Sequence, residues 1–383
     1  MSKVEVIVSS MPAKNIDVGL DIGCGQCVLP VGYAGASFSE IDGESSCNFC
    51  LDHEEPNFLG GEKLIQDLNL VPDEQVGVMV SGGKDSLYAW MWFVDKLGPD
   101  KVVGFNHNKI GLTHPLAEGN LIRAAKILGS QLIRVNDSEM LPRFQKNLSV
   151  LLEKPDEAMV RVALCAGCRH GISGVLFAEG EKMGITKYIS AASYLELAPF
   201  KGAVMQLKGD GDEREGLLVG LKENSGYDHG DNVKVIMRED DHCHKGQLTA
   251  GGSYDLYPGI VYFDFDNYFP NIPEKTEELV KERLGWERPE RSWHFDCEIE
   301  TFKDLFYYGL LGYTETDYNL SAQIRFGLIE RDEAIARLLK ARKGIINSRP
   351  EVFDLMKRLG VEALIPKVDK FYCESLFLSE QVR

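Results

Sequence analysis

Between residues 75 and 193, short apolar runs alternate with longer segments whose apolar residues recur at helical spacing. Short apolar runs bounded by turn residues are typical of buried strands, and the longer segments are typical of amphipathic helices. This alternation predicts a parallel sheet with helices on both faces. The predicted strands are 76–80, 101–106, 131–135 and 185–190, and the predicted helices are 86–97, 116–129, 138–152 and 167–183.

The regions on either side of this alternation have different patterns. Residues 1–60 are rich in Gly and Cys and show little periodicity, whereas the chain beyond Trp286 is mainly helical, notably at 321–345 and 350–360. The apolar run PGIVYFDFD (258–266) predicts one more strand that closes the sheet, and the charged, Gly-rich segment 208–232 predicts a mobile loop. We expect an α/β fold in three parts: a Cys-rich segment at 1–60, a Rossmann-like domain at 61–270 and a helical domain at 271–383.

The stretch VGVMVSGGKDSLYAWMWFV (76–94) joins an apolar strand directly to a helix through two glycines. Gly82 and Gly83 let the backbone turn sharply and approach a ligand with no Cβ in the way. The following helix, expected to start near Ser86, presents free N–H groups and a positive dipole end to the loop. Lys84 adds a positive charge, so the stretch predicts a phosphate site.

The polar residues of the loop add further candidates for this site. Ser81 and Ser86 supply hydroxyls, and Asp85 could hold Mg²⁺ or orient the reacting groups. A tight strand-to-helix turn that happens to use Gly-Gly is the alternative reading, but it does not explain six consecutive residues S-G-G-K-D-S. The spacing G-x-x-x-x-G-K-[ST] of kinases and GTPases is absent.

Residues 81–86 instead resemble the PP-loop of the ATP pyrophosphatase superfamily, whose signature is SGGxDS. The resemblance implies a Rossmann-like sheet and cleavage of ATP between its α and β phosphates, with AMP transferred to a carbonyl or carboxylate oxygen. It also implies that Asn106 and His107, in VVGFNHN, lie where family members bind the adenosine. For His107, an ordinary residue at the end of a strand is an equally good interpretation.

Four of the nine cysteines form a pattern typical of a zinc ribbon. The pairs Cys24-x-x-Cys27 and Cys47-x-x-Cys50 have the spacing of two knuckles around one tetrahedral Zn²⁺. A site closed by four thiolates is structural, and it would hold together a segment too small to build its own core.

Two further stretches, CGQCVLPVGYAGASFSEIDGESSCNFC and LLGYTETDYNLSAQIRFGLIERDEAIARLL (310–339), resemble the N-acetyl sugar amidotransferase branch of the superfamily. The resemblance implies conversion of an acetamido group on a nucleotide-linked sugar to an acetamidino group, with ammonia from a partner glutaminase. Relatives also suggest a homodimer.

The chain departs from this branch at Cys165-x-x-Cys168 and at Cys297, where that branch lacks the pair and tends to carry Ser. A C-x-x-C after the PP-loop and one later cysteine are similar to the tRNA thiolases, in which three thiolates hold a [4Fe–4S] cluster with one open iron. Cys243, in REDDHCHKG, is the rival third ligand. A redox disulfide or a second zinc pair is the alternative for Cys165 and Cys168. His170, Lys201 and Arg325 are weaker candidates for contact with ligands.

The overall charge bears on the acceptor. Lys and Arg number 42 against 59 Asp and Glu, a net charge of −17, which disfavours a nucleic acid as the main partner. The N-terminus does not have the pattern of a secretion signal, and no apolar run spans a bilayer, so we expect a cytoplasmic protein.

The leading expectation is therefore an enzyme that uses ATP and Mg²⁺ to adenylate a carbonyl oxygen of a small molecule and replaces that oxygen with sulfur. The sulfur would come from a sulfide donor through a cluster on Cys165, Cys168 and Cys297. An amidotransferase that takes ammonia from a glutaminase is the alternative. A third hypothesis is a non-catalytic module that binds ATP without releasing pyrophosphate.

Overall fold

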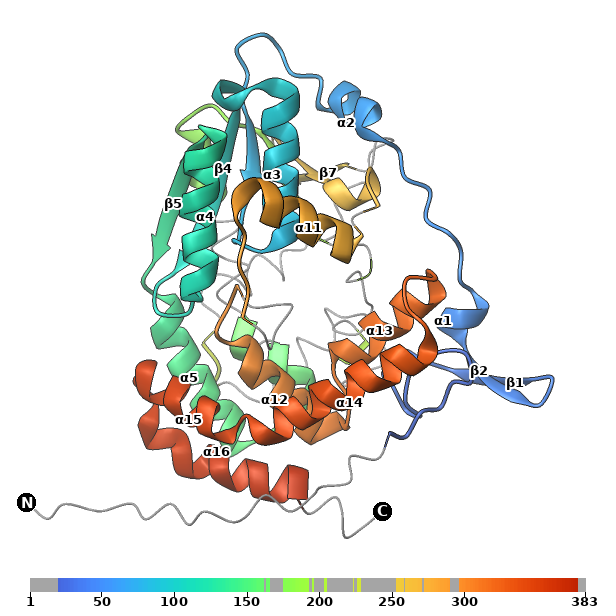
Figure 1. Ribbon diagram of the computed structural model, residues 1–383. Helices are drawn as coiled ribbons and strands as arrows, with labels where there is room; N and C mark the ends of the chain where they lie inside the picture. Colours follow the sequence, from blue (N-terminus) through green and yellow to red (C-terminus); the bar gives the residue numbers. More distant parts are fainter. Residues whose placement is uncertain are drawn as a thin grey trace, which may run out of the picture.

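The computed structural model describes the strands and helices that surround the PP-loop-like stretch and most of the C-terminal region (Figure 1). The described residues are 20–161, 163–165, 175–192, 195, 203–204, 223, 226–228, 253–257, 259–270, 272–289 and 296–377.

The centre of the fold is a six-stranded sheet in the order β5–β4–β3–β6–β8–β7. The first five strands in this order run parallel, and β7 pairs antiparallel with β8. The predicted α/β fold with a parallel sheet is thereby confirmed, and the apolar run 258–266 does form a strand of this sheet, but the edge strand beyond it is β7, which was not predicted. The strands are β3 (Val76–Met79), β4 (Val102–Lys109), β5 (Gln131–Asp137), β6 (Lys187–Ser190), β7 (Ser253–Tyr257) and β8 (Ile260–Asp264).

Both faces of the sheet are covered, because successive strand residues point to opposite sides. Val102 belongs to the core on one face and Val103 to the core on the other. The first face packs against α2 (Gly61–Leu68), α3 (Lys84–Leu97), α4 (Pro115–Leu128) and α11 (Pro273–Leu284), and the second packs against α7 (Phe177–Glu181).

The C-terminal region is helical. Its helices at Glu300–Leu311, Arg349–Arg358 and Ile365–Tyr372 share a second core with an earlier helix, α5 (Met140–Glu153), whereas Leu320, Ala334 and Leu338 belong to a separate cluster with Val28. These helices lie together below the sheet in Figure 1. No helix in the described part of the chain combines the length and the hydropathy that crossing a bilayer would require. The C-terminal helices are α12 (Glu300–Leu311), α13 (Glu315–Arg325), α14 (Arg331–Asn347), α15 (Arg349–Arg358) and α16 (Ile365–Tyr372).

The range 321–345 is mainly helical, as predicted, but it contains two helices, because α13 ends before Gly327 and α14 begins after it. Gly327 has φ of 62°, the left-handed conformation that ends helices. The apolar periodicity resumes at once beyond this glycine, which is why the sequence pattern looks continuous. Residues 167–174 of the predicted helix 167–183 and most of the predicted loop 208–232 lie outside the described residues.

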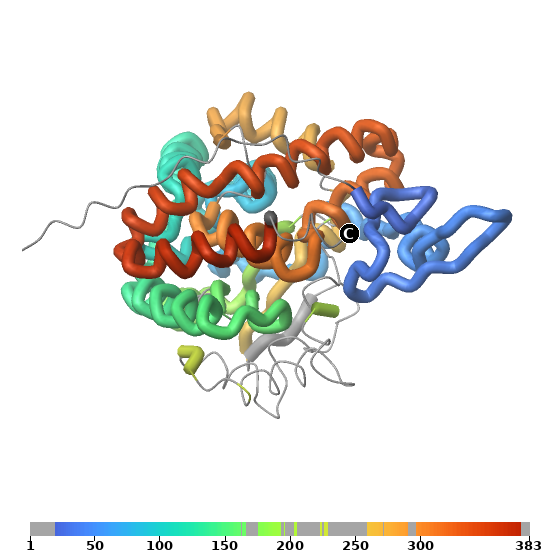
Figure 2. The backbone as a smooth tube through the Cα atoms, turned by 90° about the horizontal axis from the view of Figure 1, so that it is seen from below, coloured from blue at the N-terminus to red at the C-terminus, as the bar shows by residue number. Residues whose placement is uncertain are grey.

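The Cys-rich segment forms a small module, defined here as residues 20–52. Its hairpin joins β1 (Phe38–Ile41) to β2 (Glu44–Cys47) through Asp42 and Gly43, with φ of 54° and 82°. An Asp-Gly pair with positive φ at both residues is the favoured two-residue hairpin turn. The helix α1 (Asn48–Leu51) follows, and the module lies beside α13 and α14 (Figures 1 and 2).

Candidate functional site

The loop between β3 and α3 has the geometry of an anion cradle. α3 begins at Lys84, two residues before the predicted start, with Gly83 as its N-cap residue. Gly82 has φ of 91°, and a Cβ at this position would lie 2.2 Å from the carbonyl oxygen of Ala117. Only glycine fits there, so the sharp turn that aims the start of α3 at the loop is encoded by this residue.

The two serine hydroxyls of the motif hold the loop in shape. The N–H of Ser81 donates to Oγ of Ser86 at 3.1 Å, and the N–H of Gly83 donates to Oγ of Ser81 at 3.3 Å. The Ser86 hydroxyl in turn donates to the carbonyl of Gly83 at 3.1 Å. The serines were predicted to bind phosphate, and this network gives them a second role in fixing the backbone amides of the loop.

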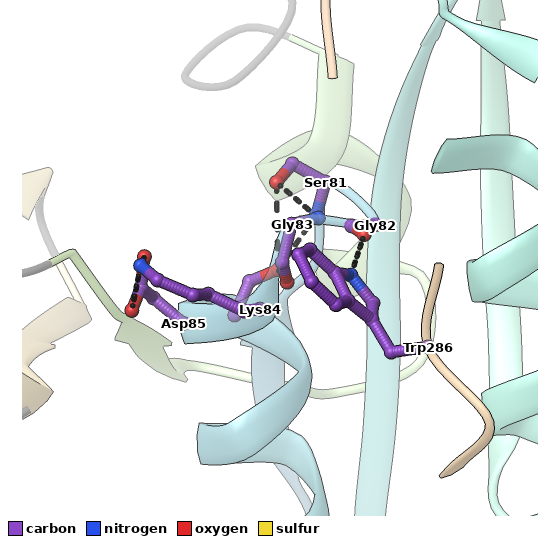
Figure 3. Close-up of polar contacts among 7 residues, drawn as sticks. Ser81, Gly82, Gly83, Lys84, Asp85 and Trp286 are labelled. Carbon is purple, nitrogen blue, oxygen red and sulfur yellow. Dashed lines mark hydrogen bonds and ion pairs between the residues drawn. The ribbon is translucent and has the colours of Figure 1, made fainter. Parts of the chain in front are cut away.

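Two residues far along the chain secure the same loop. Nε1 of Trp286 donates to the Gly82 carbonyl at 3.0 Å (Figure 3). Nδ2 of Asn120 donates to the same carbonyl at 3.3 Å. Asn120 also exchanges two hydrogen bonds with the backbone of Glu287, at 2.7 and 3.0 Å. Neither Trp286 nor Asn120 is recognisable as a site residue from the sequence, because their spacing from the motif carries no local signal.

Lys84 and Asp85 form a buried ion pair at the start of α3. Nζ of Lys84 lies 2.8 and 2.7 Å from the two carboxylate oxygens of Asp85, and Lys84 is only 5% exposed. Both side chains extend away from the Trp286 indole (Figure 3). A phosphate approaching α3 would therefore meet a lysine that is already oriented by its neighbour.

Two further carboxylates, also missed by the sequence analysis, stand at the end of β8. Burial, followed by the charge of Asp266, raises the pKa of Asp264 to about 7. Burial raises the pKa of Asp266 to about 6, and the charge of Asp85 contributes to this shift. Burial and neighbouring carboxylates therefore disfavour the charged form of both side chains. The sequence signal that could have identified these two carboxylates is the pair of closely spaced aspartates in FDFD (263–266).

Asn106 and His107 are consecutive residues of β4, so their side chains face opposite sides of the sheet. Nδ2 of Asn106 donates to the Val80 carbonyl at 2.8 Å, and Nε2 of His107 lies 2.9 Å from a carboxylate oxygen of Asp137. Within the described structure, the buried Oδ1 of Asn106 and Nδ1 of His107 have no hydrogen-bond partner. Contact of either one with adenosine stays a prediction.

A cavity of about 1880 Å³ adjoins the loop. Lys84, His114 and Ala192 line it from the sheet domain, Cys297 lines it from the segment that leads into α12, and Thr301 lines it from the first turn of α12. The segment at Cys297 forms an antiparallel bridge with Thr113, directly after β4. The structure thus brings one predicted cysteine and the predicted phosphate-binding lysine to the walls of a single cavity.

Cys165 lies near the same helix as Cys297. Burial opposes a positive charge on Lys303. Its pKa nevertheless lies well above the ordinary value, because the carboxylate oxygens of Glu300 and Glu315 lie 2.8 and 3.2 Å from its Nζ and because Cys165 adds to their effect. Cys165 therefore lies within electrostatic range of α12. Cys297 lies three residues before the start of the same helix. Cys168, Cys243, His170 and Lys201 lie outside the described residues.

The four cysteines of the N-terminal module converge as the spacing predicts. Their Sγ atoms all lie within 4.8 Å of one another, with 3.9 Å between Cys24 and Cys50 and 3.7 Å between Cys27 and Cys47. Four thiolates at Zn–S distances of about 2.3 Å around a tetrahedral ion would be about 3.8 Å apart. The donor set and its size therefore fit a metal ion such as Zn²⁺.

Electrostatics within this group also indicate a cation. Hydrogen bonds from Cys27, Cys47 and Cys50 lower the pKa of Cys24, whereas hydrogen bonding to Cys24 and Cys27 raises the pKa of Cys47 and of Cys50 well above the ordinary value. Four adjacent thiolates cannot all ionise unless a positive ion balances them. Arg331 also donates to the carbonyls of Cys24 and Cys27, which ties the group to α14.

Arg325 does not reach the cavity wall and instead stacks over Tyr318, with 5.0 Å from its guanidinium carbon to the ring centroid.

In comparisons with known proteins, no family model matches the chain, and no curated protein matches it significantly.

Proposed function

We propose that this chain is an ATP pyrophosphatase of the PP-loop type that activates a carbonyl oxygen of a small molecule. The observation that carries the proposal is the buried Lys84 at the start of α3, beside a glycine loop and at the wall of a large cavity. A buried lysine and orientated amides stabilise the charge that develops on a departing pyrophosphate. A binding module would not require this preorganisation.

The reaction has two steps in this proposal. The carbonyl oxygen of the acceptor attacks the α-phosphorus of ATP, and pyrophosphate leaves toward Lys84 and the amides of the loop. A nucleophile then adds to the acceptor carbon, and the oxygen departs with AMP. Asp85, Asp264 and Asp266 are the residues that would hold Mg²⁺, and the ion would supply positive charge that stabilises the phosphates.

We propose sulfide as the nucleophile because the chain carries the pair Cys165 and Cys168 and the single Cys297. A [4Fe–4S] cluster with one open iron would supply sulfide. Cys297 at the cavity wall and Cys165 beside α12 support this assignment, since both cysteines pack against the same hydrophobic core near one end of α12. The alternative is ammonia from a glutaminase, and it leaves these cysteines without a role.

Product analysis tests the adenylation. Incubation with ATP, Mg²⁺ and candidate acceptors should release AMP and pyrophosphate in equal amounts, whereas ADP and orthophosphate would contradict the proposal. Iron analysis of anaerobically purified protein separates sulfide from ammonia as nucleophile.

The cysteine variants refine the iron measurement. Cys165→Ala and Cys297→Ala should each lose iron, and Cys373→Ala, at an exposed position, is the matched control. If Cys297→Ala retains iron and Cys243→Ala loses it, Cys243 is the third ligand. Full iron content in Cys165→Ala, or no iron in the unmodified protein, would overturn the cluster.

A further inference from the structure

His114 lies between the two parts of the proposed site. It is the N-cap residue of α4, and one turn further along this helix Ala117 packs against the glycine loop, where a Cβ at Gly82 would lie 2.2 Å from the Ala117 carbonyl oxygen. Three residues of helix cover about 4.5 Å along the axis. On the other side, the N–H of His114 donates to the carbonyl of Asp296 at 3.4 Å, directly before Cys297. The backbone therefore holds His114 between the loop and Cys297.

The hydrogen bonding of the His114 ring determines which nitrogen carries the proton. The N–H of Leu116 donates to Nδ1 of His114 at 3.1 Å, which caps the start of α4. A nitrogen that accepts a hydrogen bond must keep its lone pair, so the proton of this neutral imidazole lies on Nε2. Because His114 also lines the cavity, Nε2–H is the hydrogen-bond donor that the ring can offer to a molecule bound there.

The three arginines that line the same cavity already pair with carboxylates. The pairs are Arg288 with Glu277 at 3.2 Å, Arg337 with Glu333 at 2.6 Å and Arg358 with Glu298 at 3.2 Å. Arg337 and Arg358 belong to the C-terminal helices, whereas His114 is attached to the helix that packs against the glycine loop. His114 is therefore better placed than these arginines to reach a phosphate held by the loop.

A neutral donor at this place can serve one particular part of the nucleotide. In the proposed reaction, Lys84 and the amides of the loop stabilise the departing pyrophosphate. Negative charge is also spread over the non-bridging oxygens of the phosphate under attack. A preoriented donor stabilises such charge in the transition state, and a neutral imidazole can do so without giving up its proton.

We propose that His114 is a catalytic residue of the adenylation, and that its Nε2–H donates a hydrogen bond to a non-bridging oxygen of the α-phosphate. This inference rests on the proposed function. The acceptor oxygen bonds to the α-phosphorus, the bond from this phosphorus to the oxygen that bridges to the β-phosphate breaks, and the electron pair leaves with pyrophosphate. The proton stays on Nε2 throughout, so His114 neither gains nor loses charge.

His114→Asn separates the chemistry from the fold, because Asn is a good N-cap residue but its side chain is too short to place a donor where Nε2 lies. We expect a normal unfolding transition in urea. AMP release from MgATP, measured with water as the acceptor, should fall about 100-fold, the effect of removing one oxyanion donor. Calorimetric affinity for α,β-methylene ATP should fall far less. Glu118→Gln, in the same first turn and paired with Arg134, is the control and should keep the normal rate.

NMR and a sulfur-substituted nucleotide test the hydrogen bond itself. In the unmodified protein, the nitrogen resonances of His114 should show a protonated Nε2 and an unprotonated Nδ1, and α,β-methylene ATP with Mg²⁺ should shift the Nε2 resonance. ATPαS carries sulfur in place of one non-bridging α-oxygen. One of its diastereomers should slow AMP release by the unmodified protein more than it slows release by His114→Asn.

Failure of this inference and failure of the proposed function give different results. Equal rates in His114→Asn and Glu118→Gln, a proton on Nδ1, or no response of Nε2 to the analogue overturns the role of His114. AMP and ADP are measured separately on the same samples. ADP and orthophosphate in place of AMP, with the Nε2 response intact, overturn the adenylation but keep His114 as a contact of the nucleotide.

Discussion

The indole of Trp286 donates a hydrogen bond of 3.0 Å to the carbonyl oxygen of Gly82, across 204 positions of sequence. The bond fixes the carbonyl group of Gly82, the loop residue that has φ of 91°. Trp286 itself packs in the core beneath α3 and α11, together with Val280 and Leu284. The segment after α11 therefore determines the shape of a loop that the local sequence only makes possible.

Trp286→Phe keeps the ring in the core but removes the N–H donor, so it tests this bond. We expect the free energy of unfolding to fall by about 1 kcal/mol, and ATP affinity to fall about threefold to tenfold because the loop is less well fixed. Urea unfolding and calorimetry with MgATP measure the two effects. The control is Trp92→Phe, on α3 and packed against Phe269 away from the loop. Equal loss of ATP affinity in both variants would count against a role for the bond.

The two glycines of the loop should respond differently to alanine. Gly82→Ala places a Cβ against Ala117 and forces a residue with a side chain into positive φ, so we expect a loss of about 2 kcal/mol or more in stability. Gly83 has φ of −73°, and its nearest added contact is Oγ of Ser81 at 3.3 Å. Gly83→Ala should therefore fold normally.

In the folded Gly83→Ala protein, ATP affinity should nevertheless fall more than about tenfold, since the new methyl group projects where phosphate approaches the amides. Thermal unfolding and calorimetry of the two variants separate folding from binding. Unchanged ATP affinity in Gly83→Ala would show that the phosphates lie elsewhere.

The carboxylates at the end of β8 should make stability depend on pH. The pKa values of Asp264 and Asp266 are raised from 3.8 to about 7 and about 6, so the folded chain binds more protons than the unfolded chain between these limits. Their contribution to stability is present below about pH 4 and is lost as the pH rises toward 7. For Asp266 the loss is about 3 kcal/mol.

Asp266→Asn should remove most of that loss, and Mg²⁺ should stabilise the unmodified protein more at about pH 7.5 than at about pH 5, because it requires ionised carboxylates. Thermal unfolding across this range, with and without Mg²⁺, measures both effects, with the exposed Asp73→Asn as control. A Mg²⁺ effect that is independent of pH would contradict the assignment of these carboxylates.

The cysteine group of the N-terminal module should hold one metal ion per chain. Cys47→Ser should lose that ion, lower the unfolding temperature and increase hydrogen exchange in α13, because the Val28–Ser321 contact loses its support. Cys373→Ser, at an exposed position, should change none of these. Metal analysis and hydrogen exchange are the measurements, and full metal retention in Cys47→Ser would exclude the site.

Local signals in the sequence predicted much of this architecture. Strand and helix periods predicted the parallel sheet, and the spacing of Cys24, Cys27, Cys47 and Cys50 predicted that these four thiols converge. These signals succeed because backbone conformation and ligand spacing act over a few residues. The same reasoning predicted helix over 321–345 without locating the break at Gly327, because the apolar periodicity resumes directly beyond this single glycine.

The sequence by itself determined the glycine turn, the charged start of α3 and the two knuckles of the cysteine group. Only the tertiary structure decided that Trp286 and Asn120 hold the Gly82 carbonyl, and that His114 lies on the wall of the cavity that Lys84 also lines. The reason is physical: a turn or a knuckle is encoded by adjacent residues, whereas the walls of a cavity come from elements whose relative positions depend on how their apolar faces pack.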